Sequence, residues 1–168
     1  KQEIPIVVTA ENGSTRTYKI NITRNISVSL DISEILRTLN IKNDGNYIYG
    51  YALETDISTI LKSITDKEPK AKATGMNKSS GAIASGDTIN IKTDREEKKY
   101  TIIIYGDVNG DGKITATDYM MIKNDIMDIK KLTELEKICA DVSRDGNITA
   151  SDYMMIKNDI MDIKPIIQ

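Results

Sequence analysis

The chain has 168 residues, of which 39% are hydrophobic and 29% are charged, values near the averages of globular proteins. It contains no histidine, and its single cysteine excludes an intrachain disulfide or a zinc site built from several thiolates. The net charge of −2 gives no reason to expect nucleic acid as a partner, and no apolar run approaches the roughly 18 residues of a membrane span. No signal peptide is expected at residue 1. The lack of Trp and Phe removes the usual aromatic platforms for sugars, which lowers the expectation of a catalyst.

Residues 1–25 carry two alternating stretches, 4–9 and 15–23, on either side of the turn-forming sequence AENGS. This pattern predicts a β-hairpin, and a lone hairpin is only marginally stable in water. The sequence VTAENGSTRTYKINITR resembles the last hairpin of the cadherin-like β-sandwich domains of secreted bacterial proteins. The resemblance implies that residues 1–25 are the end of a larger cadherin-like or Ig-like domain.

Residues 26–105 predict a small α+β module. Apolar residues at helical spacing predict amphipathic helices at 31–39 and 56–64, the first with Asp31 and Glu34 as a capping pair. Strands are predicted at YIYGY, whose three tyrosines would share one face, and then at DTINIK and at KYTIIIY, the last buried on both faces. The stretch GMNKSSGAIASG between them is predicted to be a flexible loop.

The last third of the chain, 106–168, contains an internal repeat. Residues 106–130 and 140–164 are identical at 20 of 25 positions, with a period of 34 residues. The segment 106–168 holds 8 basic and 12 acidic side chains, a local charge of −4 that repels itself unless cations offset it. A short packing helix is predicted in the linker at 131–139, next to a buried and unreactive Cys139.

Each repeat opens with a twelve-residue loop that places oxygen-bearing side chains at positions 1, 3, 5 and 12 and glycine at position 6. Calcium takes about six to eight hard oxygen ligands from such a short curled loop, and the carbonyl of position 7 supplies another. We therefore predict two Ca²⁺ ions. Their predicted ligands are Asp107, Asn109, Asp111, the Lys113 carbonyl and Asp118 in the first loop, and Asp141, Ser143, Asp145, the Asn147 carbonyl and Asp152 in the second.

The loops depart from an ordinary EF-hand in two ways. Position 12 is Asp rather than Glu, and a strand-like segment precedes the first loop where an entering helix would be. Two such loop–helix units joined by a short linker resemble a type I dockerin, with GDVNGDGKI and ADVSRDGNI as the paired signature. The resemblance covers 106–165 and implies a small all-α domain of two F-hand repeats that docks a secreted enzyme onto a cohesin. It also extends upstream, since the order of elements in 26–105 is similar to a small module that often precedes clostridial dockerins.

The helix of each repeat has two apolar sets. Tyr119, Ile122, Ile126 and Ile129, with their equivalents Tyr153, Ile156, Ile160 and Ile163, are predicted to face the core, while the opposite side needs a partner or fills the core with methionine. In the family, the residues before the last ligand and the exposed side of the same helix recognise the cohesin. The predicted cohesin contacts are Ala116, Thr117, Met120, Met121, Lys123, Asn124, Ala150, Ser151, Met154, Met155, Lys157 and Asn158. Because the copies are nearly identical, one cohesin is predicted to bind either copy, so that the domain docks in two orientations. The rival interpretation is a duplication in which only one copy binds.

Dockerins often tie their ends together by packing an aromatic on a proline. Tyr105 and Pro165 are therefore predicted to form a terminal clasp, with a frayed tail as the alternative. The function expected from all of this is a non-catalytic, calcium-dependent docking module of a cellulosome-like assembly for polysaccharide degradation. We expect it to be monomeric, without nucleic acid or membrane partners, and extracellular or surface-attached in a low-GC Gram-positive bacterium. The rivals are a calcium sensor of the EF-hand type and a fragment of a carbohydrate-active enzyme with its own activity.

Overall fold

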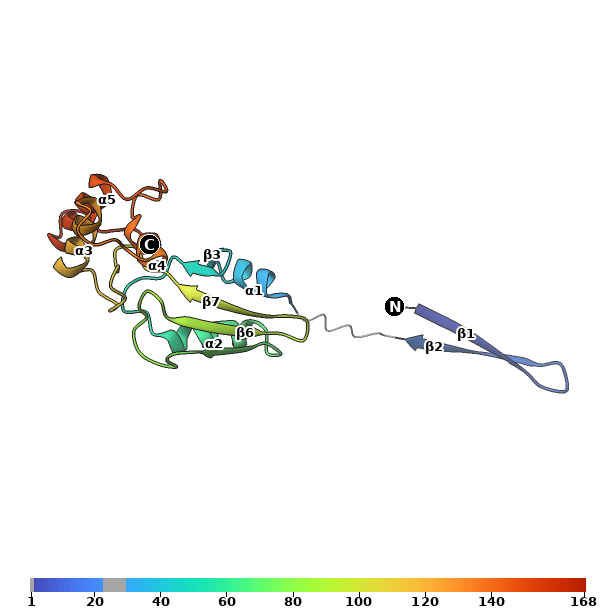
Figure 1. Ribbon diagram of the computed structural model, residues 1–168. Helices are drawn as coiled ribbons and strands as arrows, with labels where there is room; N and C mark the ends of the chain where they lie inside the picture. Colours follow the sequence, from blue (N-terminus) through green and yellow to red (C-terminus); the bar gives the residue numbers. More distant parts are fainter. Residues whose placement is uncertain (1, 23–29) are drawn as a thin grey trace.

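The computed structural model describes residues 2–22 and 30–168 (Figure 1). The described residues form seven strands and five helices, in a mixed α+β arrangement. The first two strands, β1 (Gln2–Thr9) and β2 (Thr15–Ile22), pair antiparallel and confirm the predicted hairpin. Its turn is closed by Asn12, whose side-chain oxygen accepts the Ser14 amide at 3.1 Å. Residues 1 and 23–25 of the predicted first segment lie outside the described residues.

A five-stranded sheet follows, in the order β3-β4-β7-β6-β5. Its strands are β3 (Lys42–Asp44), β4 (Tyr47–Tyr49), β5 (Lys72–Gly75), β6 (Thr88–Lys92) and β7 (Glu97–Ile102). Strands β4 and β7 are parallel, whereas the other neighbours are antiparallel. Burial alternates along β6, where Ile89 and Ile91 point into the core, as its sequence pattern predicted.

Two helices supply the rest of this core. They are α1 (Ile32–Thr38) and α2 (Ile57–Lys67), and each begins after an aspartate whose side chain accepts an amide of the first turn. Both predicted helices are therefore confirmed, although Glu34 pairs with Arg37 instead of returning to the cap. The helices and the sheet share one hydrophobic cluster. This cluster is made of Ile32, Ile35, Leu36, Ile41, Ile48, Ile57, Ile60, Ile64, Ala71, Ile83, Ile89, Ile91, Tyr100, Ile102 and Ile104.

The structure corrects two of the strand predictions. Tyr51 does not share a face with Tyr47 and Tyr49, because β4 ends at Tyr49 and Gly50 turns the chain at φ +93°, so Tyr51 packs on the core instead. Strand β7 ends at Ile102 rather than at residue 105. Ile104 is fully buried, but its backbone N–H and C=O bond to the Ser85 hydroxyl rather than to a neighbouring strand.

The C-terminal part of the chain is helical. It contains α3 (Ala116–Ile126), α4 (Glu134–Ala140) and α5 (Ala150–Ile160), which Figure 1 shows gathered at one end of the sheet. Helix α4 is the predicted linker helix, shifted toward the C-terminus, with Thr133 and Glu136 forming its capping box. These helices enclose a second hydrophobic cluster, formed by Val108, Ile122, Leu132, Ala140, Val142 and Ile156. No helix among the described residues has the length and apolar character needed to cross a lipid bilayer.

Candidate functional site

The first loop is organised around Asp107, which is completely buried. Its Oδ1 accepts the Asp111 amide at 3.0 Å, and its Oδ2 accepts the Gly112 amide at 3.1 Å and the Ser85 amide at 2.8 Å. Burial raises the pKa of Asp107 above its ordinary value, and the nearby Asp118 carboxylate adds to that rise. Two acidic groups in one buried place favour a cation between them.

Asp118 closes the same loop and is also completely buried. Its Oδ1 accepts the amides of Val108 and Asn109 at 2.8 and 3.0 Å, and its Oδ2 accepts the amide of Thr115 at 2.9 Å. Thr115 in turn caps α3, as its place three residues before the aspartate predicted. Position 12 of the loop is therefore fixed both to the start of the loop and to the start of the helix.

The second loop repeats this arrangement. Asp141 accepts the amides of Asp145 and Gly146 at 3.1 and 2.9 Å, and buried Asp152 accepts the amide of Ser143 at 2.8 Å. Thr149 caps α5 in the same way that Thr115 caps α3. The exposure of position 1 differs between the copies, since Asp141 is half-buried whereas Asp107 is fully buried.

The donors of both loops fit a hard cation, because the side chains at the predicted ligand positions carry oxygen and no thiol or imidazole competes with them. Among residues 2–22 and 30–168, no three acidic, histidine or cysteine side chains are placed to hold a metal ion together. At position 5 of the first loop, Asp111 is exposed, and its carboxylate accepts the Asn109 side-chain nitrogen and the Lys113 amide. The ligand sets therefore stay a prediction.

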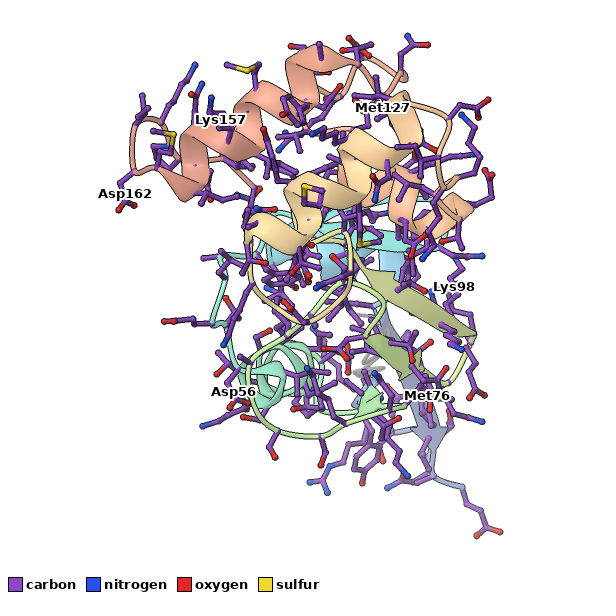
Figure 2. The ribbon with its side chains drawn as sticks, turned by 60° about the vertical axis from the view of Figure 1, so that its left-hand side comes forward. Asp56, Met76, Lys98, Met127, Lys157 and Asp162 are labelled. Carbon is purple, nitrogen blue, oxygen red and sulfur yellow. The ribbon has the colours of Figure 1, made fainter. Side chains whose placement is uncertain are left out.

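The helices after the loops present matching surfaces. Met120 and Met154 are each 45% exposed, and Thr117 and Ser151 are also exposed. Ala116, Ala150 and Lys157 are exposed, whereas Lys123, Asn124 and Asn158 are half-buried. Figure 2 shows Met127 and Lys157 on the helical part, away from Asp56 and Met76 at the far end of the sheet. The residues predicted to contact a partner are therefore largely accessible.

Met121 and Met155 are half-buried and pack against the second hydrophobic cluster. Their role as partner contacts stays a prediction, and part of each side chain belongs to the core.

The predicted core side of these helices is only half right. Ile122 and Ile156 are fully buried, and Tyr119 and Tyr153 pack against the second cluster, as predicted. The later members of the set, Ile126, Ile129, Ile160 and Ile163, are all exposed. Ile129 and Ile163 lie beyond the helix ends at residues 126 and 160, after aspartates at 128 and 162 that take positive φ, so helical spacing does not apply to them. Ile126 and Ile160 are the last residues of α3 and α5 and are exposed although the spacing still applies.

The two tyrosines of the repeat contact each other. Tyr119 stacks on Tyr153 with ring centroids 4.1 Å apart and an interplanar angle of 26°, and their hydroxyls are hydrogen-bonded. A residue that contacts its own equivalent indicates a local two-fold relation between the copies. The prediction of two binding orientations requires such a two-fold relation between α3 and α5.

The two ends of the helical part are joined by Gln168. Its side-chain oxygen accepts the Tyr105 amide at 2.8 Å and its side-chain nitrogen donates to the Tyr105 carbonyl at 2.9 Å. The Arg144 guanidinium lies 4.3 Å from the centroid of the Tyr105 ring. The predicted packing of Tyr105 on Pro165 is a separate contact and stays a prediction.

One part of the site was missed by sequence reasoning. The stretch predicted to be a flexible loop buries Ile83 in the first cluster and brings the Ser85 amide to Asp107. The sequence did contain one indication that this stretch is packed: Ile83 is an apolar residue inside a Gly- and Ser-rich stretch.

Comparison with known proteins agrees with the geometry of the C-terminal part. Residues 105–161 match the model of the dockerin type I domain family. No curated protein matches the chain. Dockerins are non-catalytic modules that in general bind calcium and cohesins, and they are typically extracellular.

Proposed function

We propose that residues 106–168 form a calcium-dependent docking domain that binds one cohesin and so attaches a secreted enzyme to a scaffold or cell surface. The observation that carries the proposal is the matched pair of loop–helix units. Each has a buried aspartate at position 12 that also completes the capping box of its helix, and each exposes the same helix surface. The dockerin type I match over 105–161 supports the same function.

Calcium in this proposal acts on folding. The first ion would be held by Asp107, Asn109, Asp111, Asp118 and the Lys113 carbonyl, and the second by the equivalent residues of the second loop. When bound, each ion supplies positive charge to carboxylates that otherwise repel one another at close range. Its binding free energy therefore adds to the free energy of folding of the helical part.

The docking surface in this proposal is the exposed side of α3 or of α5. Thr117 and Met120 in the first copy, and Ser151 and Met154 in the second, would be buried in the contact. Lysine and asparagine residues would lie around them, in the polar margin usual for protein interfaces. Because the copies are equivalent, a half-turn of the domain presents the other copy to the same cohesin site, which gives two orientations and one cohesin per chain.

The rest of the chain is proposed to have a supporting role. Residues 26–105 would be a spacer module of the kind that precedes dockerins, and residues 1–25 the end of a β-sandwich domain. The hairpin's exposed Ile6, Val8 and Tyr18 are consistent with further strands packing on it. The catalytic part of the parent protein, with the polysaccharide it acts on, would lie elsewhere.

Co-elution with purified type I cohesins tests this function. The full chain is mixed with a panel of cohesin modules and analysed by size-exclusion chromatography in calcium and in excess chelator. We expect a 1:1 complex with at least one cohesin in calcium and free components in chelator. Binding that survives chelation, or folded calcium-loaded chain that binds no cohesin in the panel, would contradict the proposal.

A further inference from the structure

The 83–86 loop lies directly against the first of the two repeat loops. Its Ser85 amide donates to Asp107 Oδ2 at 2.8 Å, so a carboxylate oxygen of position 1 is held from outside its own loop. In the second copy, Asp141 accepts the amides of Asp145 and Gly146, both from within its loop. The two candidate calcium sites therefore differ, although their sequences are nearly identical.

The 83–86 loop approaches two glycines of the first loop so closely that a side chain would not fit at either position. A Cβ on Gly110 would lie 2.7 Å from the Ser85 carbonyl oxygen, and one on Gly112 would lie 2.9 Å from the Ile83 carbonyl oxygen. The second copy has Arg144 where the first has Gly110, in the same left-handed backbone conformation (φ +60° and +72°). A Cβ on Gly146 would meet nothing within 4 Å. The 83–86 loop therefore explains why the first copy has glycine where the second copy, which this loop does not contact, has arginine.

The 83–86 loop is well placed to act as a fixed donor. Ile83 is fully buried, and its amide donates to the Thr55 carbonyl at 2.8 Å. The Ser85 hydroxyl bonds to both backbone groups of Ile104, and the Gly86 amide donates to the Ile102 carbonyl at 2.9 Å. The donor is held by the sheet and core of the preceding residues, so it does not have to be ordered when an ion arrives.

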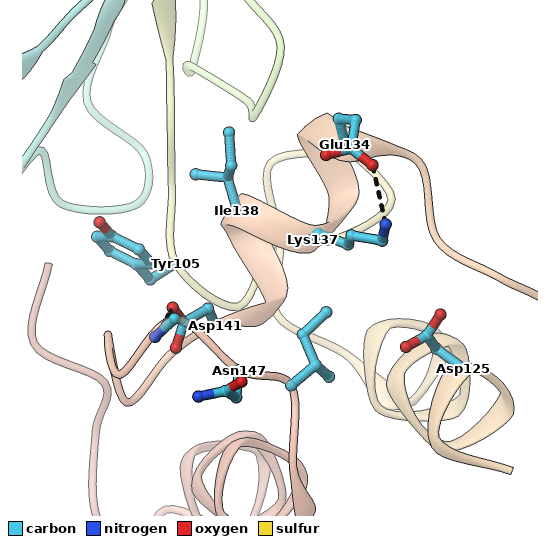
Figure 3. Close-up of a pocket in the computed structure, with 9 residues that line it drawn as sticks. Tyr105, Asp125, Glu134, Lys137, Ile138, Asp141 and Asn147 are labelled. Atoms are coloured by element: carbon cyan, nitrogen blue, oxygen red, sulfur yellow. Dashed lines mark hydrogen bonds and ion pairs between the residues drawn. The ribbon is translucent and has the colours of Figure 1, made fainter.

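Both loops border a cavity, but position 1 is partly exposed only in the second, since Asp141 is half-buried whereas Asp107 is fully buried. Gly146 and Asn147 line a cavity of about 520 Å³ together with Asp141 and residues of α4 (Figure 3). Solvent in this cavity screens the carboxylate of Asp141 and weakens its attraction for a cation. Asp107 lacks this exposure, because its side chain is fully buried.

We infer that the 83–86 loop is a positioning element of the first calcium site, through the Ser85 amide, and that it makes this site tighter and slower to release its ion than the second. The inference rests on the proposed calcium function of both loops. An amide that already holds one oxygen of Asp107 fixes the carboxylate in orientation, so less ordering is left to the binding step. A hydrogen bond to a charged group accounts for roughly a tenfold difference in release rate between the sites.

Stopped-flow release of calcium from the full chain into a fluorescent chelator tests the inference. We expect two phases of equal amplitude that differ about tenfold in rate. Ser85→Pro and Ser85→Ala both remove the hydroxyl, but only the proline variant removes the N–H. The proline variant should bring the slow phase close to the fast one, whereas the alanine variant, whose loop is still held by Ile83 and the Gly86 amide, should retain most of the separation.

A matched pair of glycine variants gives a second test that does not change Ser85. Gly112→Ala and Gly146→Ala carry similar strain, because the two residues have φ of +80° and +85°, but only the first meets the 83–86 loop. We expect Gly112→Ala to accelerate the slow phase more than Gly146→Ala accelerates the fast one. A single release rate in the unmodified chain, or equal effects within either pair, would overturn the inference while leaving a two-calcium dockerin intact. A chain that binds no calcium would overturn the proposed function as well.

Discussion

Tyr119 stacks on Tyr153, its own equivalent 34 residues further along the chain, with 4.1 Å between the ring centroids. This contact lies on the inner side of α3 and α5, where both rings pack against the second hydrophobic cluster. An approximate two-fold relation through these rings explains why the outer sides of the helices match in exposure. The core contact and the proposed docking surfaces are therefore two consequences of one duplication.

The tyrosine pair gives the first prediction. Tyr153→Phe keeps the stacked rings and removes one hydroxyl, so it should lower the free energy of unfolding by only about 1 kcal/mol. Tyr153→Ala removes the ring and leaves a cavity, and should cost about 3–5 kcal/mol. Urea unfolding in excess calcium measures both. Similar losses in the two variants would mean that the hydroxyl contact, not the stacking, holds the copies together.

The buried and exposed isoleucines of the repeat give the second prediction. Ile122→Ala and Ile156→Ala should each cost about 2–5 kcal/mol, because both side chains are fully buried. Ile129→Ala and Ile163→Ala should each cost less than about 0.5 kcal/mol, since those side chains are 65% and 64% exposed. The same urea titration distinguishes the two groups. Equal losses at all four positions would support the prediction from periodicity that all four side chains face the core.

Removal of a loop carboxylate gives the third prediction. Asp118→Ala should abolish calcium binding by the first loop and unfold it, because the aspartate also accepts three backbone amides and completes the capping box of α3 with Thr115. Circular dichroism during a calcium titration measures the loss of helix. The matched control is Asp128→Asn, which removes an exposed carboxylate of the same repeat at a positive φ that asparagine tolerates. If the control loses as much helix as Asp118→Ala, general charge rather than the loop is responsible.

The single thiol gives the fourth prediction. Burial raises the pKa of Cys139 to about 11, and the side chain lines a small cavity with Ser85 and Gly110 beside the first loop. At pH 8 the thiol is therefore almost wholly protonated and shielded, and a thiol reagent should label it very slowly in calcium. Excess chelator should increase the labelling rate at least tenfold, toward that of the unfolded chain. Rapid labelling in calcium, with no change on chelation, would contradict the packing of α4 against the first loop.

Charge reversal on the docking surfaces gives the fifth prediction. Changing Thr117 and Met120 to glutamate should weaken cohesin binding only about twofold, because one of two equal orientations remains. Ser151 and Met154 changed alone should behave in the same way. Changing both pairs should abolish binding, since a charge buried in a desolvated contact costs several kcal/mol. Calorimetric titration with the cohesin measures each affinity, and loss of binding in one folded single-copy variant would mean that only that copy is used.

Local sequence signals predicted the features of the fold that depend on neighbours in the chain. The Asp-capped helices α1 and α2, and the threonine caps of α3 and α5, are set within four residues of the cap. The exposure of Ile129 and Ile163 could not be predicted from such local signals. A hydrophobic period gives the angle of a side chain on a helix but not the residue at which the helix ends.

Contacts between distant segments were also beyond prediction from one sequence. Ser85 meets Asp107 through its backbone amide, a donor that every residue except proline carries, so its side chain gives no indication of the contact. The clearest sign in the sequence is the replacement of Gly110 by Arg144 at the same loop position. The difference is explained by the contact between the 83–86 loop and the first copy, which the sequence alone does not show.

Native mass spectrometry of the full chain mixed with type I cohesins in calcium tests calcium-dependent docking most directly. We expect one species that contains a single chain, two calcium ions and one cohesin, and its loss in excess chelator. A cohesin complex that carries no calcium would contradict calcium-dependent docking, and so would a folded chain that gains neither ion nor cohesin.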